Sequence, residues 1–187
     1  MGKLFYLKLA MTNLKKNRNA YIPYILAGMG MVFTYILFLY IRKNDGISNI
    51  IGQDYLAMLF SFGTAIISIF SVIFIFYANS FLMKRRKKEI ALYGILGLEK
   101  RHVAIVMFLE TVISSLISIV GGCILGIVFG RLFFMILMKL TRVASGSKFV
   151  FKPAIFLNAA IFFIIVYIVT LLWNLIQVRM SKPIELL

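Results

Sequence analysis

Four long uncharged stretches restrict this chain to folds that cross a membrane. They comprise residues 19–41, 55–83, 111–130 and 153–178. Each reaches the ~20 residues that a helix needs to span a bilayer. The sequence therefore predicts an all-α integral membrane protein with four transmembrane helices.

The predicted transmembrane helices differ in length. We expect them over about residues 20–42, 55–83, 104–138 and 153–178, within a single domain of residues 1–187. At ~1.5 Å per residue the second would be ~43 Å long and the third ~54 Å, against a hydrocarbon core of ~30 Å. Helices 2 and 3 are therefore predicted to extend into the cytoplasm.

Composition agrees with this class of protein. Of the 187 residues, 62% are apolar and 14% are charged, and the net charge is +15. In a soluble protein such a charge would suggest nucleic-acid binding, but here most Lys and Arg flank the apolar stretches. That position is typical of residues that fix orientation in a membrane. We expect no nucleic-acid partner.

Orientation follows from the distribution of the cations. Four crossings place both termini and the segment 84–103 on one side of the membrane, and that side carries 14 of the 21 basic residues. Cytoplasmic loops carry the excess of Lys and Arg. The prediction is a multi-pass protein of the cell membrane with both termini in the cytoplasm.

The amino-terminal segment, residues 1–19, has the pattern of an interfacial helix. Leu4, Leu7, Met11 and Leu14 recur at spacings of three and four residues, while lysines occupy the positions between them. Such a helix lies on the membrane with its apolar side toward lipid and its cations toward anionic headgroups. Membrane lipid is thus an expected partner.

The segment 84–103 between the second and third stretches begins with five consecutive cations, Lys84 to Lys88. Each would cost a few kcal/mol in hydrocarbon on insertion scales. We therefore expect the whole run to stay in water, followed by an amphipathic part that a partner could contact.

Glu110 is the one acidic residue in the third predicted helix. An unpaired carboxylate near the centre of a bilayer would be expensive. Two interpretations stay open: a structural salt bridge or polar cap near the interface, and a proton relay.

A series of small residues follows Glu110 on the same helix at intervals of four. They are Ser114, Ser118, Gly122, Gly126 and Gly130. A ridge of small side chains lets another helix approach closely, and this is a main source of helix association in lipid. The pattern predicts a helix-packing seam, either within the chain or between chains.

No catalytic or metal-binding pattern is present. The sequence has one histidine, one cysteine (Cys123, in the third stretch), no phosphate-binding glycine loop and no paired acids inside a span. We expect no cofactor, no metal and no enzymatic activity.

Two segments resemble a known family. Lys87 to His102, with Glu110-Thr111 further on, resembles the cytoplasmic connection of FtsX-like permeases, and Pro183 to Leu187 resembles the motif that ends that domain. The basic amphipathic start and the short connection between the first two spans are most similar to the amino-terminal half of a Bce-type permease. Such permeases belong to ABC systems that sense and resist antimicrobial peptides.

The resemblance implies a transmembrane permease subunit that couples ATP hydrolysis in a partner ATPase to movement at the outer face of the membrane. ATP hydrolysis would then occur in the partner. The implied ATPase-docking residues are Glu89, Ile90, Tyr93, Leu96, Gly97, Glu99 and Arg101.

The resemblance also leaves alternatives open. Bce-type permeases continue into further spans and a large outer domain, so the chain could be a truncated product, a split half that pairs with a second permease half, or a minimal permease that forms a homodimer. A function from another class is a noncatalytic regulatory membrane protein that binds a sensor histidine kinase or a cell-wall enzyme. A secondary transporter is less favoured, because no intramembrane ionisable pair is visible in the sequence.

Overall fold

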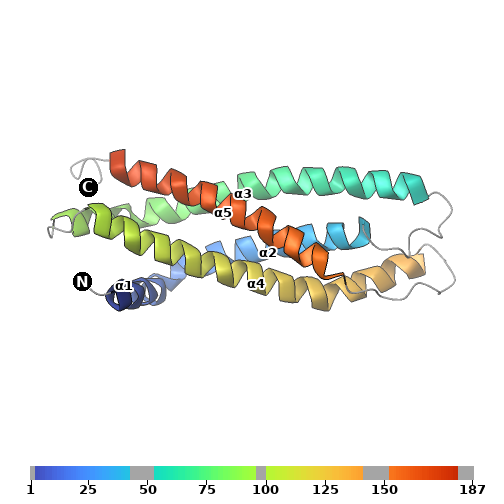
Figure 1. Cartoon of the computed structure of the whole chain (residues 1–187), viewed down its shortest axis with the longest axis horizontal. Coiled ribbons are helices and arrows are strands. Elements are labelled where there is room, and N and C mark those ends of the chain that lie inside the picture. Colours follow the sequence, from blue (N-terminus) through green and yellow to red (C-terminus); the bar gives the residue numbers. More distant parts are fainter. Residues whose placement is uncertain (1–2, 43–52, 96–99, 141–151, 181–187) are drawn as a thin grey trace. The chain divides into compact units, whose positions relative to one another are not determined.

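The computed structural model describes residues 3–42, 53–95, 100–140 and 152–180, and all secondary structure in these residues is helical. Figure 1 labels the helices in chain order. They are α1 (Lys3–Lys16), α2 (Arg18–Arg42), α3 (Gln53–Ile95), α4 (Lys100–Leu140) and α5 (Pro153–Met180). The predicted fold class is confirmed.

Four of these helices are long and apolar enough to cross a membrane. The candidate spans within the described residues are Arg18–Arg42, Ala57–Arg86, Arg101–Phe133 and Pro153–Gln177, with mean hydropathy between 1.9 and 2.7. Helices α3 and α4 contain 43 and 41 residues, which corresponds to ~60 Å or more for each helix. The segment 84–103 is largely helical, because α3 continues to Ile95 and α4 begins at Lys100.

The chain forms two compact units. Unit 1 comprises residues 1–27, 74–117 and 164–187, and unit 2 comprises residues 28–73 and 118–163. Each of α2, α3, α4 and α5 therefore contributes one part to each unit.

In unit 2, α2 and α4 pack closely because α4 presents glycines. A Cβ atom at Gly122 would lie 2.5 Å from Cβ of Val32, and one at Gly126 would lie 2.7 Å from Cγ2 of Ile36. Aromatic rings join α2 to α5, since the ring of Tyr35 stacks on Phe162 with centroids 4.9 Å apart. Leu39, Tyr40 and Ile155 form a buried apolar cluster beside these rings.

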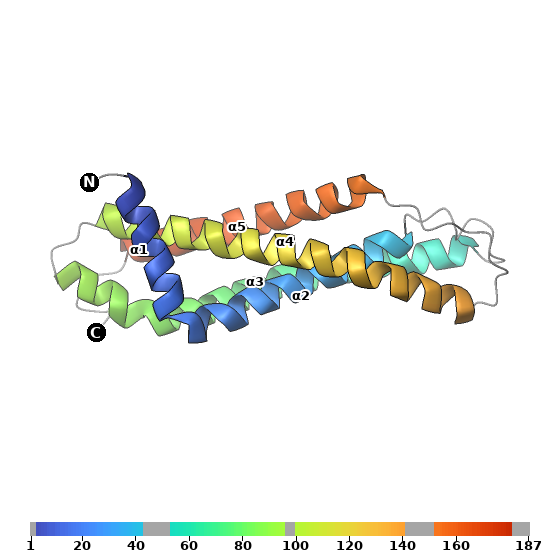
Figure 2. The same ribbon diagram turned by 90° about the horizontal axis from the view of Figure 1, so that it is seen from below.

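In unit 1, α1 lies across the direction of α2 (Figure 2). The two helices meet at Asn17, whose backbone carbonyl accepts hydrogen bonds from the amides of Ala20 and Tyr21. The side of α1 that carries Ala10 and Asn13 is buried. On another side Leu7 and Met11 are about half exposed, as expected of a helix that lies on lipid.

Candidate functional site: a buried polar cluster

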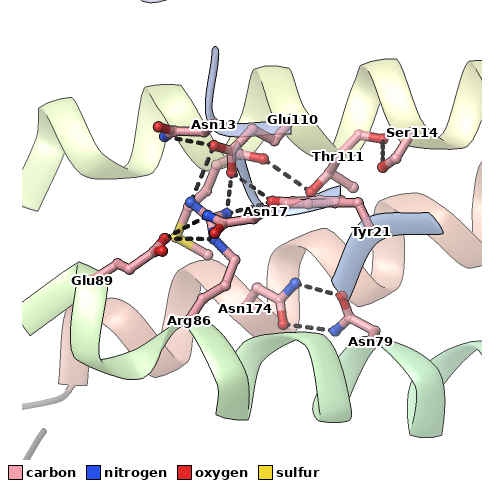
Figure 3. A network of polar contacts seen from close by, with 11 residues as sticks. Asn13, Asn17, Tyr21, Asn79, Arg86, Glu89, Glu110, Thr111, Ser114 and Asn174 are labelled. Atoms are coloured by element: carbon pink, nitrogen blue, oxygen red, sulfur yellow. Dashed lines mark hydrogen bonds and ion pairs between the residues drawn. The ribbon is translucent and has the colours of Figure 1, made fainter. Parts of the chain in front are cut away.

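An ion pair between Arg86 on α3 and Glu110 on α4 forms the centre of a buried polar cluster in unit 1 (Figure 3). Nη1 of Arg86 donates to Oε2 of Glu110, and Nη2 donates to Oε1 at 3.1 Å. The guanidinium thus binds both carboxylate oxygens, which is the strong bidentate geometry. Arg86 is 4% exposed and Glu110 is 1% exposed, so the pair is removed from solvent.

Two neutral side chains complete the hydrogen bonding of this carboxylate. Nδ2 of Asn13 donates to Oε1 of Glu110 at 2.9 Å, and the hydroxyl of Tyr21 donates to Oε2 at 2.9 Å. Each oxygen therefore accepts one bond from Arg86 and one from a neutral donor. These four hydrogen bonds offset the cost of burying the charge, because a buried carboxylate without partners would cost several kcal/mol.

The guanidinium of Arg86 also has partners besides Glu110. Nη1 donates to the hydroxyl of Tyr21, and the guanidinium carbon lies 5.4 Å from the centroid of the Tyr21 ring. Nε of Arg86 lies 3.7 Å from Oε2 of Glu89, which in turn accepts a 2.7 Å hydrogen bond from Nδ2 of Asn17. The cluster consequently ties α1, α2, α3 and α4 together around Arg86 and Glu89 of α3.

Helix periodicity explains how these residues meet. Asn13, Asn17 and Tyr21 follow one another at intervals of four, so the helical repeat brings them to one side of the α1–α2 junction. Arg86 and Glu89 are three residues apart on α3 and share a face.

A second polar contact joins α3 to α5 in the same unit. The side-chain amides of Asn79 and Asn174 are both buried and exchange two hydrogen bonds, of 2.8 and 2.9 Å. Asn79 lies seven residues before Arg86, which is about two turns along the same face of α3. A cavity of about 10 Å³, roughly the size of one water site, lies between the amide pair and the ion pair, where Tyr24 also contributes to its lining.

Burial of Arg86 corrects one expectation from the sequence. The whole run from Lys84 to Lys88 was expected in water, but Arg86 is buried, while Lys84 and Arg85 are exposed. The reason is that an arginine at this position can reach a carboxylate on α4. The expectation of a structural salt bridge at Glu110 is confirmed.

The predicted ATPase-docking residues are distributed around the α3–α4 connection. Glu89 is one-third exposed and is held by Asn17 and Arg86, whereas Arg101, on the first turn of α4, is exposed. Ile90 and Tyr93 lie in the last turns of α3. Leu96, Gly97 and Glu99 lie outside the described residues, so docking at this segment stays a prediction.

The predicted ridge of small residues is arranged along α4. Ser114 and Ser118 are buried, and the hydroxyl of Ser114 donates to the carbonyl of Thr111 at 3.1 Å. Gly122 and Gly126 contact α2 in unit 2, whereas a Cβ at Gly130 would meet no atom of the described residues within 4 Å.

The analysis of the sequence missed Asn13, Tyr21, Arg86, Asn79 and Asn174. Asn79 and Asn174 carried a usable signal, because each is an amide inside an otherwise apolar stretch and such amides bond across helices. Asn13 and Arg86 are 97 and 24 residues away from Glu110, and no local pattern connects them.

Comparison with known proteins places the sequence in a family. The sequence model of the family described as FtsX-like permease C-terminal matches residues 61–183, which includes α4, α5 and most of α3. The chain belongs to the FtsX-like permease family. Within the described residues, no group of three or more His, Cys, Asp or Glu is placed to hold a metal ion.

Relatives of this FtsX-like chain are considerably longer. It is 28% identical over 181 residues to the uncharacterized ABC transporter permease YvcS of Bacillus subtilis, and 28% identical over 178 residues to the bacitracin export permease protein BceB of Halalkalibacterium halodurans. BceB of Bacillus subtilis is 26% identical. These alignments cover 95–96% of this chain but 28% of each relative, so the chain spans about a quarter of their length.

Proposed function

We propose that this chain is a transmembrane permease subunit of an ABC transporter of the Bce type, driven by a separate ATPase. The observation that carries the proposal is the family match over residues 61–183, which includes the α3–α4 connection and two complete spans. The matched relatives bear the names of ABC and bacitracin export permeases. Resistance to an antimicrobial peptide, or its sensing, is the task we assign to the assembly.

The chain is placed, in this proposal, within the amino-terminal half of such a permease. A basic helix precedes the first span, as α1 precedes α2, and a connection of about ten residues joins α2 to α3. The distribution of cations favours an orientation with both termini and the α3–α4 connection in the cytoplasm, and we adopt it here.

Docking of the ATPase is assigned to the residues around the α3–α4 connection. Ile90, Tyr93 and Leu96 supply apolar contacts, Glu89, Glu99 and Arg101 supply polar ones, and Gly97 permits the change of direction. Glu89, near the end of α3, already accepts a hydrogen bond from Asn17 at the junction of α1 and α2.

The buried polar cluster has a mechanical role in this proposal. A force on the last turns of α3 reaches α4 through Arg86 and Glu110, and it reaches α1 and α2 through Asn13, Asn17 and Tyr21. Movement of the connection would thus displace these helices together rather than bend α3 alone. We assign the packing seam on α4 to Ser114, Ser118, Gly122 and Gly126, because a Cβ at Gly130 would meet no atom of the described residues within 4 Å.

Copurification tests the docking proposal. The double variant Leu96→Asp/Gly97→Pro introduces a charge and a helix-breaking residue into the connection. We expect the wild-type chain, isolated in mild detergent, to retain a nucleotide-binding protein that is labelled by azido-ATP, and the variant to lose it. Lys15→Asp, which introduces an acidic side chain at an exposed position on α1, serves as the control and should retain the protein.

Retention of the labelled ATPase by a correctly inserted double variant would contradict docking at this segment. If the wild-type chain retains a sensor kinase or a cell-wall enzyme but no labelled ATPase, the result would contradict the proposed ATP-driven permease and favour a noncatalytic regulatory function.

A further inference from the structure

A groove between α3 and α5 in unit 1 combines a polar floor with an aromatic rim. Its volume is about 470 Å³, and Tyr77, Ser80, Trp173 and Gln177 contribute to its lining. The hydrogen-bonded amides of Asn79 and Asn174 form its polar floor.

Polar side chains at this place require an explanation, because the groove lies within two candidate membrane spans. Ser80 and Gln177 are exposed, and Tyr77 and Trp173 are 71% and 54% exposed. Lipid tails offer no hydrogen bonds to a hydroxyl or an amide. The groove therefore suits a neighbour that has both an apolar part and a polar part.

The position of the groove along the membrane normal follows from the residues that come next on α3. Lys84 lies four residues after Ser80, one turn or ~6 Å along the helix, and both side chains are exposed. Tyr77, Ser80 and Lys84 share a face of α3 because they are spaced by three and four residues. Aromatic residues and lysines gather where hydrocarbon meets headgroups, so the groove opens at headgroup depth.

Charge favours an anion in this place. Lys84 is exposed one turn beyond Ser80, on the face of α3 that carries Tyr77 and Ser80. Among the described residues, none that lines the groove carries a carboxylate. A phosphate near Lys84 would be attracted, while the acyl chains below it would contact Tyr77 and Trp173.

We propose that this groove binds one anionic phospholipid from the leaflet around the Lys84 end of α3, which is the cytoplasmic leaflet in the orientation proposed above. The phosphate lies toward Lys84, the polar headgroup meets Ser80 and Gln177, and an acyl chain fills the apolar part of the groove. The site requires only that the candidate spans cross a membrane, so it can hold even if no ATPase binds the chain.

Native mass spectrometry of the full chain in mild detergent tests the proposal. Phosphatidylglycerol and phosphatidylcholine with identical acyl chains are titrated separately. We expect one phosphatidylglycerol per chain to bind more tightly than phosphatidylcholine. Lys84→Gln removes the cation and should weaken this binding about fivefold. Ser80→Phe fills the groove and should abolish the preference.

Lys139→Gln is the matched control, because Lys139 is also exposed but lies near the end of α4, away from the groove residues in the sequence. It should bind phosphatidylglycerol like the wild type. An equal loss of phosphatidylglycerol binding in Lys84→Gln and Lys139→Gln would show that the anionic lipid is attracted to the positive charge of the chain in general, and it would overturn the site. Equal binding of phosphatidylglycerol and phosphatidylcholine would also overturn the site. So would wild-type dimers that dissociate in the Ser80→Phe variant, because the groove would then bind a second copy of the chain. Circular dichroism of each variant confirms that the helices are intact.

Discussion

Arg86 and Glu110 form a bidentate ion pair in which neither side chain is more than 4% exposed. Removal of one partner would leave the other charge buried and unpaired, at a cost of about 3–5 kcal/mol. We expect Arg86→Met and Glu110→Gln each to lower thermal stability in detergent strongly. The double variant should recover much of the loss, because both charges are then absent.

Thermal unfolding of the four proteins measures this coupling. Additive losses in the double variant would show that the two side chains do not stabilise each other, and would contradict the importance of the pair.

Tyr21 and Tyr24 provide a matched comparison of two buried hydroxyls on α2. The hydroxyl of Tyr21 donates to Glu110 and accepts from Arg86, whereas the hydroxyl of Tyr24 has no hydrogen-bond partner among the described residues. Tyr21→Phe should therefore cost about 1–3 kcal/mol in the free energy of unfolding, and Tyr24→Phe should be neutral or slightly stabilising. Equal effects of the two substitutions, measured by denaturant titration, would be evidence against the cluster.

The pair of amides between α3 and α5 predicts a third result. Asn79→Leu and Asn174→Leu each leave one buried amide without its partner, and interhelical bonds of this kind contribute about 0.6–1.7 kcal/mol. The double variant Asn79→Leu/Asn174→Leu should lose less stability than the sum of the losses in the two single variants. Asn158→Leu, at an exposed position on the same helix α5, is the control and should change the melting temperature little.

Glycines on α4 predict a graded response to one added methyl group. Gly122→Ala would place Cβ 2.5 Å from Cβ of Val32 and 2.9 Å from the carbonyl oxygen of Met29, so α2 and α4 must separate. Overpacking of this kind costs about 1–3 kcal/mol. In Gly130→Ala the new methyl meets no atom within 4 Å in the part of the chain that the structure describes, so the variant should gain up to ~1 kcal/mol from helix propensity. A melting temperature that falls equally in both variants would contradict close packing at Gly122.

Prediction from the sequence succeeded for features that a single local pattern of residues is enough to determine. Continuous apolar stretches identified four helices, because a bilayer sets a minimum length that few other structures meet. The carboxylate of Glu110 in an apolar helix also indicated a salt bridge, since an unpaired charge would be too costly there.

The site was predictable only in part because its partners come from distant segments. Arg86 is one of five adjacent cations, and nothing local distinguishes the buried one from Lys84 or Arg85. Only the arrangement of α1, α3 and α4 brings Asn13 and Arg86 to the same carboxylate. Burial of a cation thus depended on tertiary contacts that hydrophobic periodicity does not encode.

Asn79 and Arg86 restrict how α3 can move in unit 1. They lie about two turns apart, and each engages a different neighbour, Asn174 on α5 and Glu110 on α4. Rotation of α3 about its axis would swing both side chains away from their partners at once, and sliding by one turn would misregister both. A collective sideways tilt of α3 with its neighbours preserves both contacts, so it is the motion of least cost for this part of the helix.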